Sequence, residues 1–243
     1  MSERAKHTKS PLNLDKVESY YHLVRHDVIN PLFQLDIQAK RVLEIGCSAG
    51  ATGKHLKEKM GIEHYVGIEM FEEAAQLARA VLDEVHIADI EKTSFSDLGF
   101  REEDFDLLVA LDVLEHLYDP WEILVSMSLL VKSGGYVVLS IPNAQNISVI
   151  ANLAHGQWKY ESAGLLDVTH IRFFTLTEIQ ELVTGAGLEV AHININFNPS
   201  INISEVQEND NSFNFGKLTM SNLTKEEIFR LFAYQYIIIA RKL

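Results

Sequence analysis

Nine residues, VLEIGCSAG at positions 42–50, constrain the fold of this chain more than any other stretch. They begin as a short apolar run, which is typical of a strand buried in a parallel sheet, and the run breaks at Gly46. Gly50 ends the turn, and Ala51–Met60 has the pattern of a helix with Gly61 at its C-terminal cap. A strand, a glycine turn and a helix in this order predict the nucleotide-binding opening of a doubly wound α/β sheet.

The glycine spacing and one acid indicate which nucleotide binds. A dinucleotide site has Gly-x-Gly-x-x-Gly, which lets the backbone approach a pyrophosphate, but here Ser48 occupies the middle glycine position. Glu44, two residues before Gly46, would repel a diphosphate and attract a ligand with a cationic ammonium end and no phosphate. S-adenosylmethionine is such a ligand. The stretch resembles motif I of the class I S-adenosylmethionine-dependent methyltransferases, many of which have glycine where this chain has Ser48.

The rest of the chain supplies the other strands of such a sheet. Apolar runs predict strands at residues 41–45, 64–68, 84–88, 105–111, 136–141, 188–197 and 234–240. The stretch LLVKSGGYVVLSIPN resembles later motifs of the same family, so the resemblance covers about residues 40–190. It implies an α/β fold: a doubly wound, Rossmann-like, seven-stranded, mostly parallel sheet with an antiparallel last strand and helices on both faces. No repeat or linker divides the chain, so we predict a single methyltransferase-like domain over residues 1–243.

Three segments stand apart from the sheet pattern. Apolar residues at helical spacing predict a helix over 14–29 that ends near Asn30-Pro31, because the residue before a proline disfavours helix; in the resembling family a leading helix, here within 1–35, lies over the cofactor. Residues 144–174 follow the carboxyl end of a strand, where open α/β sheets bind ligands, and are predicted to form the acceptor lid. Residues 198–224 are polar, and we predict a flexible excursion.

The resemblance also assigns cofactor residues. Glu69 follows the second strand and is expected to accept both ribose hydroxyls, while Asp89 would accept the adenine amine and Ile90 would pack against the ring. The leading helix would offer Arg25 or a tyrosine, although its tyrosines could equally be core residues. The full predicted cofactor set is Tyr20, Arg25, Glu44, Gly46, Cys47, Gly50, Glu69, Met70, Asp89, Ile90, Leu111 and Asp112, with Tyr21 an alternative to Tyr20.

Two stretches could act on the acceptor, Asp112-x-x-Glu115-His116 and Asp167-x-x-His170. Methyl transfer from a sulfonium is an in-line displacement, so the protein orients the acceptor and removes its proton. We predict that His116 and His170 act as general bases or polar contacts, with a purely structural role as an alternative. Small-RNA 2′-hydroxyl and ubiquinone-pathway O-methyltransferases carry a similar Glu-x-x-Glu-His stretch. That likeness implies a less favoured divalent-metal set of Asp112, Glu115, His116 and His170, in which Asp112 is shorter than the usual Glu.

The lid also carries side chains suited to holding an acceptor. Arg172 either pairs with Asp167 or binds an acidic acceptor, and we leave both alternatives open. Aromatic residues would line an apolar acceptor pocket or pack in the core. They are Trp158, Tyr160, Phe173 and Phe174.

Composition narrows the partners and the compartment. Lys and Arg number 21 against 34 Asp and Glu, a net charge of −13, which argues against long nucleic acids and anionic membrane surfaces. Cys47 is the only cysteine, so no internal disulfide forms. We find no membrane-crossing run and no secretory signal, and we therefore expect a cytoplasmic protein that binds a small-molecule acceptor and is compatible with a homodimer.

These observations predict an S-adenosylmethionine-dependent methyltransferase acting on an oxygen or nitrogen of a small molecule. The stretch DVTHIRFFT resembles bacterial methyltransferases that act on sugars, lipids or secondary metabolites. The alternatives are a non-catalytic nucleoside-binding protein of the same fold and a metal-assisted hydroxyl methyltransferase. A nicotinamide oxidoreductase is disfavoured by the missing glycine.

Overall fold

The computed structural model describes residues 23–197, 213–215 and 218–243, and its centre is a seven-stranded sheet in the order β3-β2-β1-β4-β5-β9-β6. Within this sheet β9 runs antiparallel to both of its neighbours, and the other paired strands are parallel. The predicted fold class is therefore confirmed. The strands are β1 (Arg41–Ile45), β2 (His64–Glu69), β3 (Glu84–Ile87), β4 (Phe105–Leu111), β5 (Val131–Pro142), β6 (Leu188–Phe197) and β9 (Ala233–Lys242).

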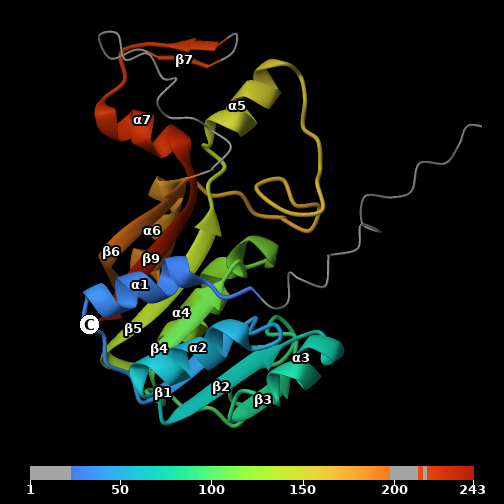
Figure 1. Cartoon of the computed structure of the whole chain (residues 1–243), viewed down its shortest axis with the longest axis vertical. Coiled ribbons are helices and arrows are strands. Elements are labelled where there is room, and N and C mark those ends of the chain that lie inside the picture. The colour runs from blue at the N-terminus through green and yellow to red at the C-terminus, as the bar shows by residue number, and fades with distance from the viewer. Residues whose placement is uncertain (1–22, 198–212, 216–217) are drawn as a thin grey trace, which may run out of the picture.

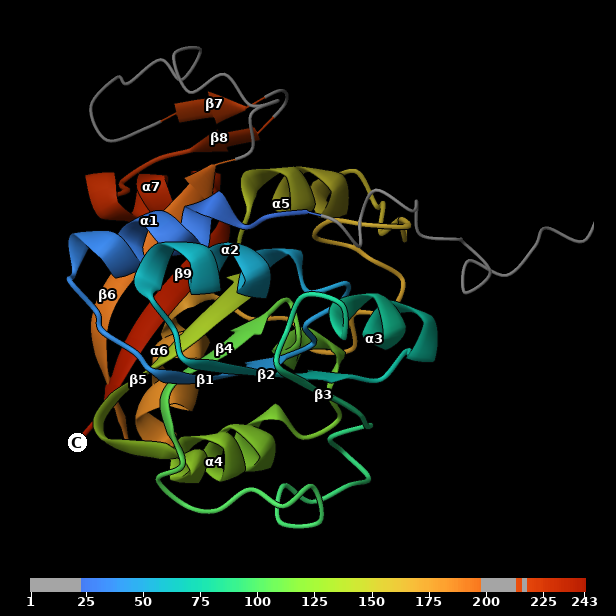
Figure 2. The same ribbon diagram turned by 60° about the horizontal axis from the view of Figure 1, so that its bottom comes forward.

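Helices cover both faces of the sheet, as Figure 2 shows. On one face lie α1 (His26–Gln34), α2 (Ala51–Met60) and α3 (Glu72–Ala78), and on the other lie α4 (Pro120–Leu130) and α6 (Leu176–Gly185). Each face of the sheet has its own apolar core. Leu56 of α2 belongs to the core on the face covered by α1, α2 and α3, and Leu124 of α4 and Ile179 of α6 belong to the core on the opposite face. Because both faces are covered, the central strands are near-continuous apolar runs.

A small group of elements lies beyond the carboxyl end of β5 (Figure 1). It comprises α5 (Ile147–Ala154), α7 (Lys225–Phe232), β7 (Phe213–Phe215) and β8 (Leu218–Met220), which share a separate apolar cluster. Two side chains that follow β5, Asn143 and Asn146, each donate from Nδ2 to the carbonyl of Ala233 at 2.8 Å. These bonds tie the start of the 144–174 segment to the last strand. Within the predicted flexible excursion 198–224, the described residues include β7 and β8; residues 198–212 and 216–217 lie outside the described residues, and the flexibility stays a prediction.

The predicted first helix differs from the observed one. Residues 14–22 lie outside the described residues, and among the others α1 begins at His26 and continues through Pro31 to Gln34 instead of ending before the proline. Proline lacks an N–H, which leaves the carbonyl of Asp27 without its helical donor. Asn194 Nδ2 on β6 donates to that carbonyl at 3.4 Å, and Pro31 is buried. A distant strand therefore compensates for the proline.

Two other boundaries were also predicted wrongly. The apolar residues at helical spacing in 71–81 predict a helix that reaches Val81, whereas α3 ends at Ala78. The strand expected to start at Tyr136 starts at Val131, because the register with β4 jumps and places residues 132–135 in a bulge around Gly134, whose φ is +80°.

Candidate functional site

A cavity of about 700 Å³ lies where β1, β2, β3 and β4 end. Its lining comes from the turn after β1, the residues that follow the other three strands, and two residues that precede α1. Gly50 is not among the lining residues, and Tyr20 lies outside the described residues. The predicted cofactor residues that do line the cavity are Arg25, Glu44, Gly46, Cys47, Glu69, Met70, Asp89, Ile90, Leu111 and Asp112.

The turn after β1 depends on left-handed backbone. Gly46 has φ +71°, and a Cβ there would lie 2.9 Å from Val113 Cγ2, so this position excludes a side chain. Ser48 also has positive φ, +51°, which explains why glycine suits the position so well. Gly50, with φ +79°, precedes the first turn of α2. Its role is to turn the chain into the helix.

Glu44 is buried at the floor of the cavity, with 3% of its surface exposed. Its Oε2 accepts a hydrogen bond from the hydroxyl of Tyr65 at 2.9 Å. Burial raises the pKa of Glu44 to about 8, the Tyr65 hydrogen bond opposes that rise, and the charge of Glu69 adds to it. Without a cationic partner, this carboxyl group holds its proton at neutral pH.

Glu69 is held by two backbone donors at the end of β2. Its Oε2 accepts from the N–H of Ser48 and its Oε1 accepts from the N–H of Phe71, both at 2.9 Å. A carboxylate oxygen accepts more than one hydrogen bond, so both oxygens keep capacity for two neighbouring hydroxyl groups. At the next strand end, Asp89 accepts from Lys92 Nζ at 2.6 Å, a hydrogen bond that lowers the Asp89 pKa.

Arg25 reaches from the segment before α1 into a polar network at the cavity wall. It donates from Nη1 to Asp112 at 2.6 Å and from Nη2 to Asp27 and Gln235, both at 2.8 Å. Burial works to lower the pKa of Arg25, but Asp27 and Asp112 raise it above its ordinary value. The guanidinium is therefore permanently charged, and it links the leading segment to β4 and β9.

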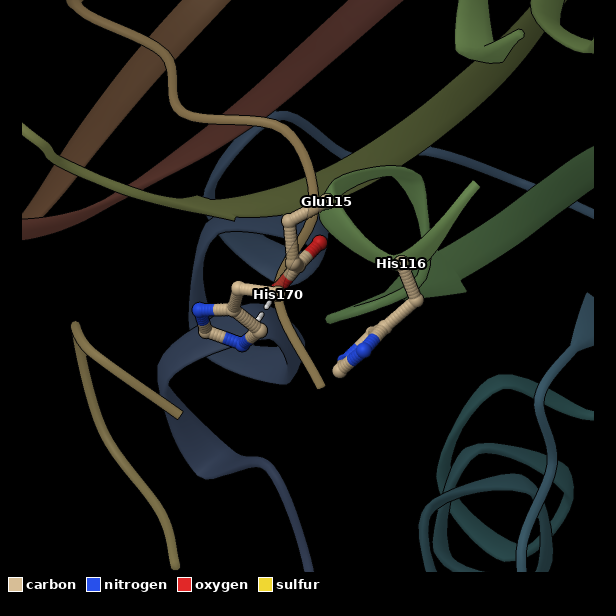
Figure 3. Close-up of side chains that lie close together, drawn as sticks. All are labelled: Glu115, His116 and His170. Atoms are coloured by element: carbon tan, nitrogen blue, oxygen red, sulfur yellow. Dashed lines mark ion pairs between the residues drawn. The ribbon is translucent and has the colours of Figure 1, made fainter. Parts of the chain in front are cut away.

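A second cluster lies beside the cavity, where a short 3-10 helix η3 (Leu114–His116) meets the lid. Ligand atoms of Glu115, His116 and His170 all lie within 4.8 Å of one another (Figure 3). Asp112, the fourth member of the less favoured metal set, is not part of this group. Asp112 has φ +56° and precedes η3, so its side chain turns toward Arg25 instead.

The predicted lid, residues 144–174, is fastened to η3 by backbone hydrogen bonds. The N–H groups of Ile171 and Arg172 donate to the carbonyl of Glu115 at 2.9 and 3.0 Å. Arg172 Nε donates to the carbonyl of Tyr118 at 3.0 Å, and its pairing with Asp167 or with an acidic acceptor stays a prediction. Asp167 accepts from the backbone N–H and the hydroxyl of Thr169.

Contacts with backbone carbonyls fix the proton positions of His116 and His170. His116 Nδ1 lies 3.1 Å from the carbonyl of Thr169, and His170 Nδ1 lies 3.3 Å from the carbonyl of Leu165. A carbonyl only accepts, so in each neutral ring the proton is on Nδ1 and the lone pair is on Nε2. Burial, together with the charge of His116, lowers the pKa of His170 to about 4. His170 Nε2 lies 3.9 Å from Glu115 Oε1, a contact that is an ion pair only when the ring is protonated.

The four aromatic residues of the predicted lid separate into one buried residue and three that are more than a third exposed. Phe174 is 3% exposed and belongs to the apolar core, so of its two expected roles the structure supports core packing. Trp158 and Phe173 form an edge-to-face pair with ring centroids 5.3 Å apart, and both are more than a third exposed, as is Tyr160. These three do not line the 700 Å³ cavity, and their contact with an acceptor stays a prediction.

Three contributors were not predicted from the sequence. Tyr65 holds Glu44 from a neighbouring strand, and Thr52 Oγ1 accepts from the N–H of Arg25 at 3.2 Å. Thr169 lines the cavity and presents the carbonyl that orients His116. Thr169 lies in the DVTH stretch and was within reach of the sequence argument, whereas the other two depend on contacts that only the fold creates.

A family model described as a methyltransferase domain matches residues 17–193. The match covers more than half of the chain, which therefore belongs to this methyltransferase family. The protein is an S-adenosylmethionine-dependent methyltransferase whose cofactor is S-adenosyl-L-methionine, as predicted. Among the described residues, no helix combines the length and the apolar character needed to traverse a bilayer.

Named relatives agree with that class. The chain is 27% identical over 190 residues to a ubiquinone biosynthesis O-methyltransferase of Neisseria meningitidis, covering 76% of this chain and 73% of the relative. It is 29% identical over 205 residues to the protein of that name from Aromatoleum aromaticum, and the match covers 77% of this chain and 82% of that relative. A solved SAM dependent methyltransferase from Archaeoglobus fulgidus is similar in fold, with a TM-score of 0.61 at 19% identity over 93% of this chain and 97% of that one.

Proposed function

We propose that this enzyme transfers a methyl group from S-adenosylmethionine to a hydroxyl oxygen of a small molecule. The observation that carries the proposal is the orientation of His116: Nδ1 is oriented by a backbone carbonyl, which leaves a lone pair on Nε2, and the residue lines the cofactor cavity. The names of the relatives, which are O-methyltransferases, support oxygen over nitrogen as the acceptor atom.

The cofactor would lie along the strand ends. Glu44 would pair with its ammonium group, and the oriented oxygens of Glu69 would accept the two ribose hydroxyls. Asp89 and Ile90 would contact the adenine from the end of β3. Arg25, tied to Asp112, would close the wall on the side of α1. These roles place the sulfonium between the β1 turn and η3.

Proton removal from the acceptor would fall to His116. The hydroxyl oxygen would attack the methyl carbon as the carbon–sulfur bond breaks, the acceptor proton would move to Nε2, and S-adenosylhomocysteine would leave as a neutral thioether. Such a base contributes about 10²–10⁴-fold. His170 lies against His116 with ring centroids 4.7 Å apart and would hold that ring in place.

A metal-assisted form of the same reaction is the second candidate. The donor set fits a divalent cation, since a carboxylate and two imidazoles converge within 4.8 Å. Both histidines also direct the other ring nitrogen at a backbone carbonyl, a common arrangement around metal ligands. Glu115, His116 and His170 would hold the ion, which would supply Lewis-acid stabilisation of the acceptor oxygen. Asp112 is excluded by its contact with Arg25.

The test is methyl transfer from labelled S-adenosylmethionine to a panel of phenols, catechols and sugars. Transfer to a hydroxyl that falls strongly in His116→Ala supports the proposal, and transfer confined to amines contradicts it. Chelator treatment followed by Mg²⁺, Mn²⁺ or Zn²⁺ addition separates the two candidates, because only the metal-assisted form loses and regains activity. Three expectations stay predictions: a cytoplasmic location, a homodimer, and a single domain with a lid at 144–174. Analytical sedimentation tests whether the protein is a homodimer.

A further inference from the structure

Tyr65 lies on β2 behind the floor of the cofactor cavity. In the register of the two strands Tyr65 faces Val42 and Gly67 faces Glu44, so the side chains of Tyr65 and Glu44 share one face of the sheet. The Tyr65 side chain is fully buried and is not among the residues that line the cavity, yet its hydroxyl donates to Glu44, which does line it. The carboxylate therefore lies between a buried phenol and the cavity.

One glycine makes room for the Tyr65 ring and another for the Cys47 side chain. Gly53 lies within α2, and a Cβ there would be 2.7 Å from Tyr65 Cε1 and 2.9 Å from Cζ. At Gly67 a Cβ would lie 2.5 Å from Cys47 Sγ. Glycine inside a helix weakens that helix, so its presence in α2 needs a packing or functional reason. Here the glycine lets the aromatic ring lie beneath the helix.

Packing alone does not require a hydroxyl at this position, because phenylalanine would fill nearly the same volume. A buried phenol needs a hydrogen-bond partner, and a hydrogen bond donated to a carboxylate favours its charged form. The bond also restricts the rotation of the Glu44 carboxylate. The titratable groups that act on Glu44 are Tyr65, Glu69 and Cys47, and of these Tyr65 is a hydrogen-bond donor to it.

We propose that Tyr65 is a positioning residue for the methyl donor, whose hydroxyl aims the Glu44 carboxylate at the amino end of S-adenosylmethionine. The proposal rests on the function proposed above, in which Glu44 pairs with that ammonium group. Tyr65 contributes through Glu44 alone and does not touch the ligand. It should therefore matter only for ligands that carry the amino-acid tail.

The test is calorimetric titration of Tyr65→Phe with two ligands. S-adenosylhomocysteine carries the amino-acid tail, and 5′-methylthioadenosine has the same nucleoside and thioether without it. We expect the Kd of S-adenosylhomocysteine to rise about 10–100-fold, as for a lost hydrogen bond to a charged group. The Kd of 5′-methylthioadenosine should change by less than about threefold. Equal weakening of both ligands, or no change in either, overturns the proposal.

Control variants distinguish a failure of the Tyr65 proposal from a failure of the proposed pairing of Glu44 with the ammonium group. Tyr236→Phe removes another buried phenol, whose oxygen has no hydrogen-bond partner among the described residues, and should bind both ligands normally. Glu44→Gln should weaken only S-adenosylhomocysteine, and Tyr65→Phe should add nothing in that background. If Glu44→Gln weakens only S-adenosylhomocysteine and Tyr65→Phe weakens neither ligand, the inference about Tyr65 fails and the role of Glu44 stands. If Glu44→Gln weakens both ligands equally, the proposed pairing of Glu44 with the ammonium group fails. Should Tyr65→Phe not fold, Gly53→Ala, which displaces the same ring, should give the same selective loss.

Discussion

Glu44→Gln tests how the enzyme recognises the charged end of its methyl donor. Burial raises the pKa of Glu44 to about 8 in the protein without ligand. At pH 6.5, 1.5 units below that value, about 97% of the molecules carry a neutral side chain at this position. The ammonium group of S-adenosylmethionine favours the ionised form, so its arrival should expel the proton into solvent.

The size of the effect follows from the pKa. Ionising Glu44 at pH 6.5 costs about 2 kcal/mol, which is taken from the binding free energy. The α-amino group of the ligand has an ordinary pKa of about 8 and stays charged at this pH. We therefore expect release of about 0.9 proton per ligand at pH 6.5, and an affinity that rises almost tenfold per unit between about pH 5.5 and 7. Above about pH 8 the ligand amine loses its proton and the affinity falls.

The assay is calorimetric titration of S-adenosylmethionine at pH 6.5 in two buffers of different ionisation enthalpy. Wild type should show proton release, whereas Glu44→Gln should bind more weakly, release no proton and keep a flat affinity from about pH 5.5 to 7. Tight binding by wild type with no proton exchange, or an unchanged profile in Glu44→Gln, would refute the reasoning.

Four further outcomes are expected. Glu69→Ala should abolish S-adenosylmethionine binding in calorimetry with its thermal unfolding midpoint intact, and normal binding would remove the ribose assignment. His170→Ala should keep the cofactor Kd but lower turnover by about tenfold or more, since His170 supports His116, and unchanged turnover would make His170 structural. Leu124→Ala, at a fully buried site on α4, should lose about 2–5 kcal/mol in urea unfolding, and a smaller loss would mean that the site collapses around the cavity. Without ligand, the unfolding free energy of wild type should fall relative to that of Glu44→Gln as pH rises from about 5 to 8, because the folded state keeps a proton that the unfolded chain has lost; a constant difference would contradict the raised pKa.

The parts of the fold that depend on local signals were predicted well. The predicted bounds of β1, β4 and β6 are the observed ones, since these apolar runs are long and clearly ended. The start of α4 carries an equally local signal, an Asp followed by a Pro: Asp119 Oδ1 accepts from the N–H of Glu122 at 3.0 Å, and Pro120 is the first residue of the helix. Such signals lie within a few residues of the structure they determine.

Two of the errors have a common cause, which is a contact between distant parts of the chain. Pro31 was expected to stop α1, and no local rule reveals that Asn194 would satisfy the carbonyl it leaves without a donor. Asp112 was grouped with Glu115 on the assumption of a helix, whereas left-handed backbone turns its side chain to Arg25. Ten of the predicted cofactor residues line the cavity, because most of them stand at or just after the strand ends, and their contacts with the cofactor stay a prediction.

The position of β9 has a consequence for the order in which parts of the sheet can form. This strand follows β6 in the chain, yet it inserts between β5 and β6, and the carbonyl of Ala233 at its start accepts hydrogen bonds from both Asn143 and Asn146. The strands β1 to β4 pair among themselves, whereas β6 joins the sheet through β9 and the segment after β5 is tied to the same strand. In refolding, the sheet around the cavity should therefore form before the region beyond β5 is fixed.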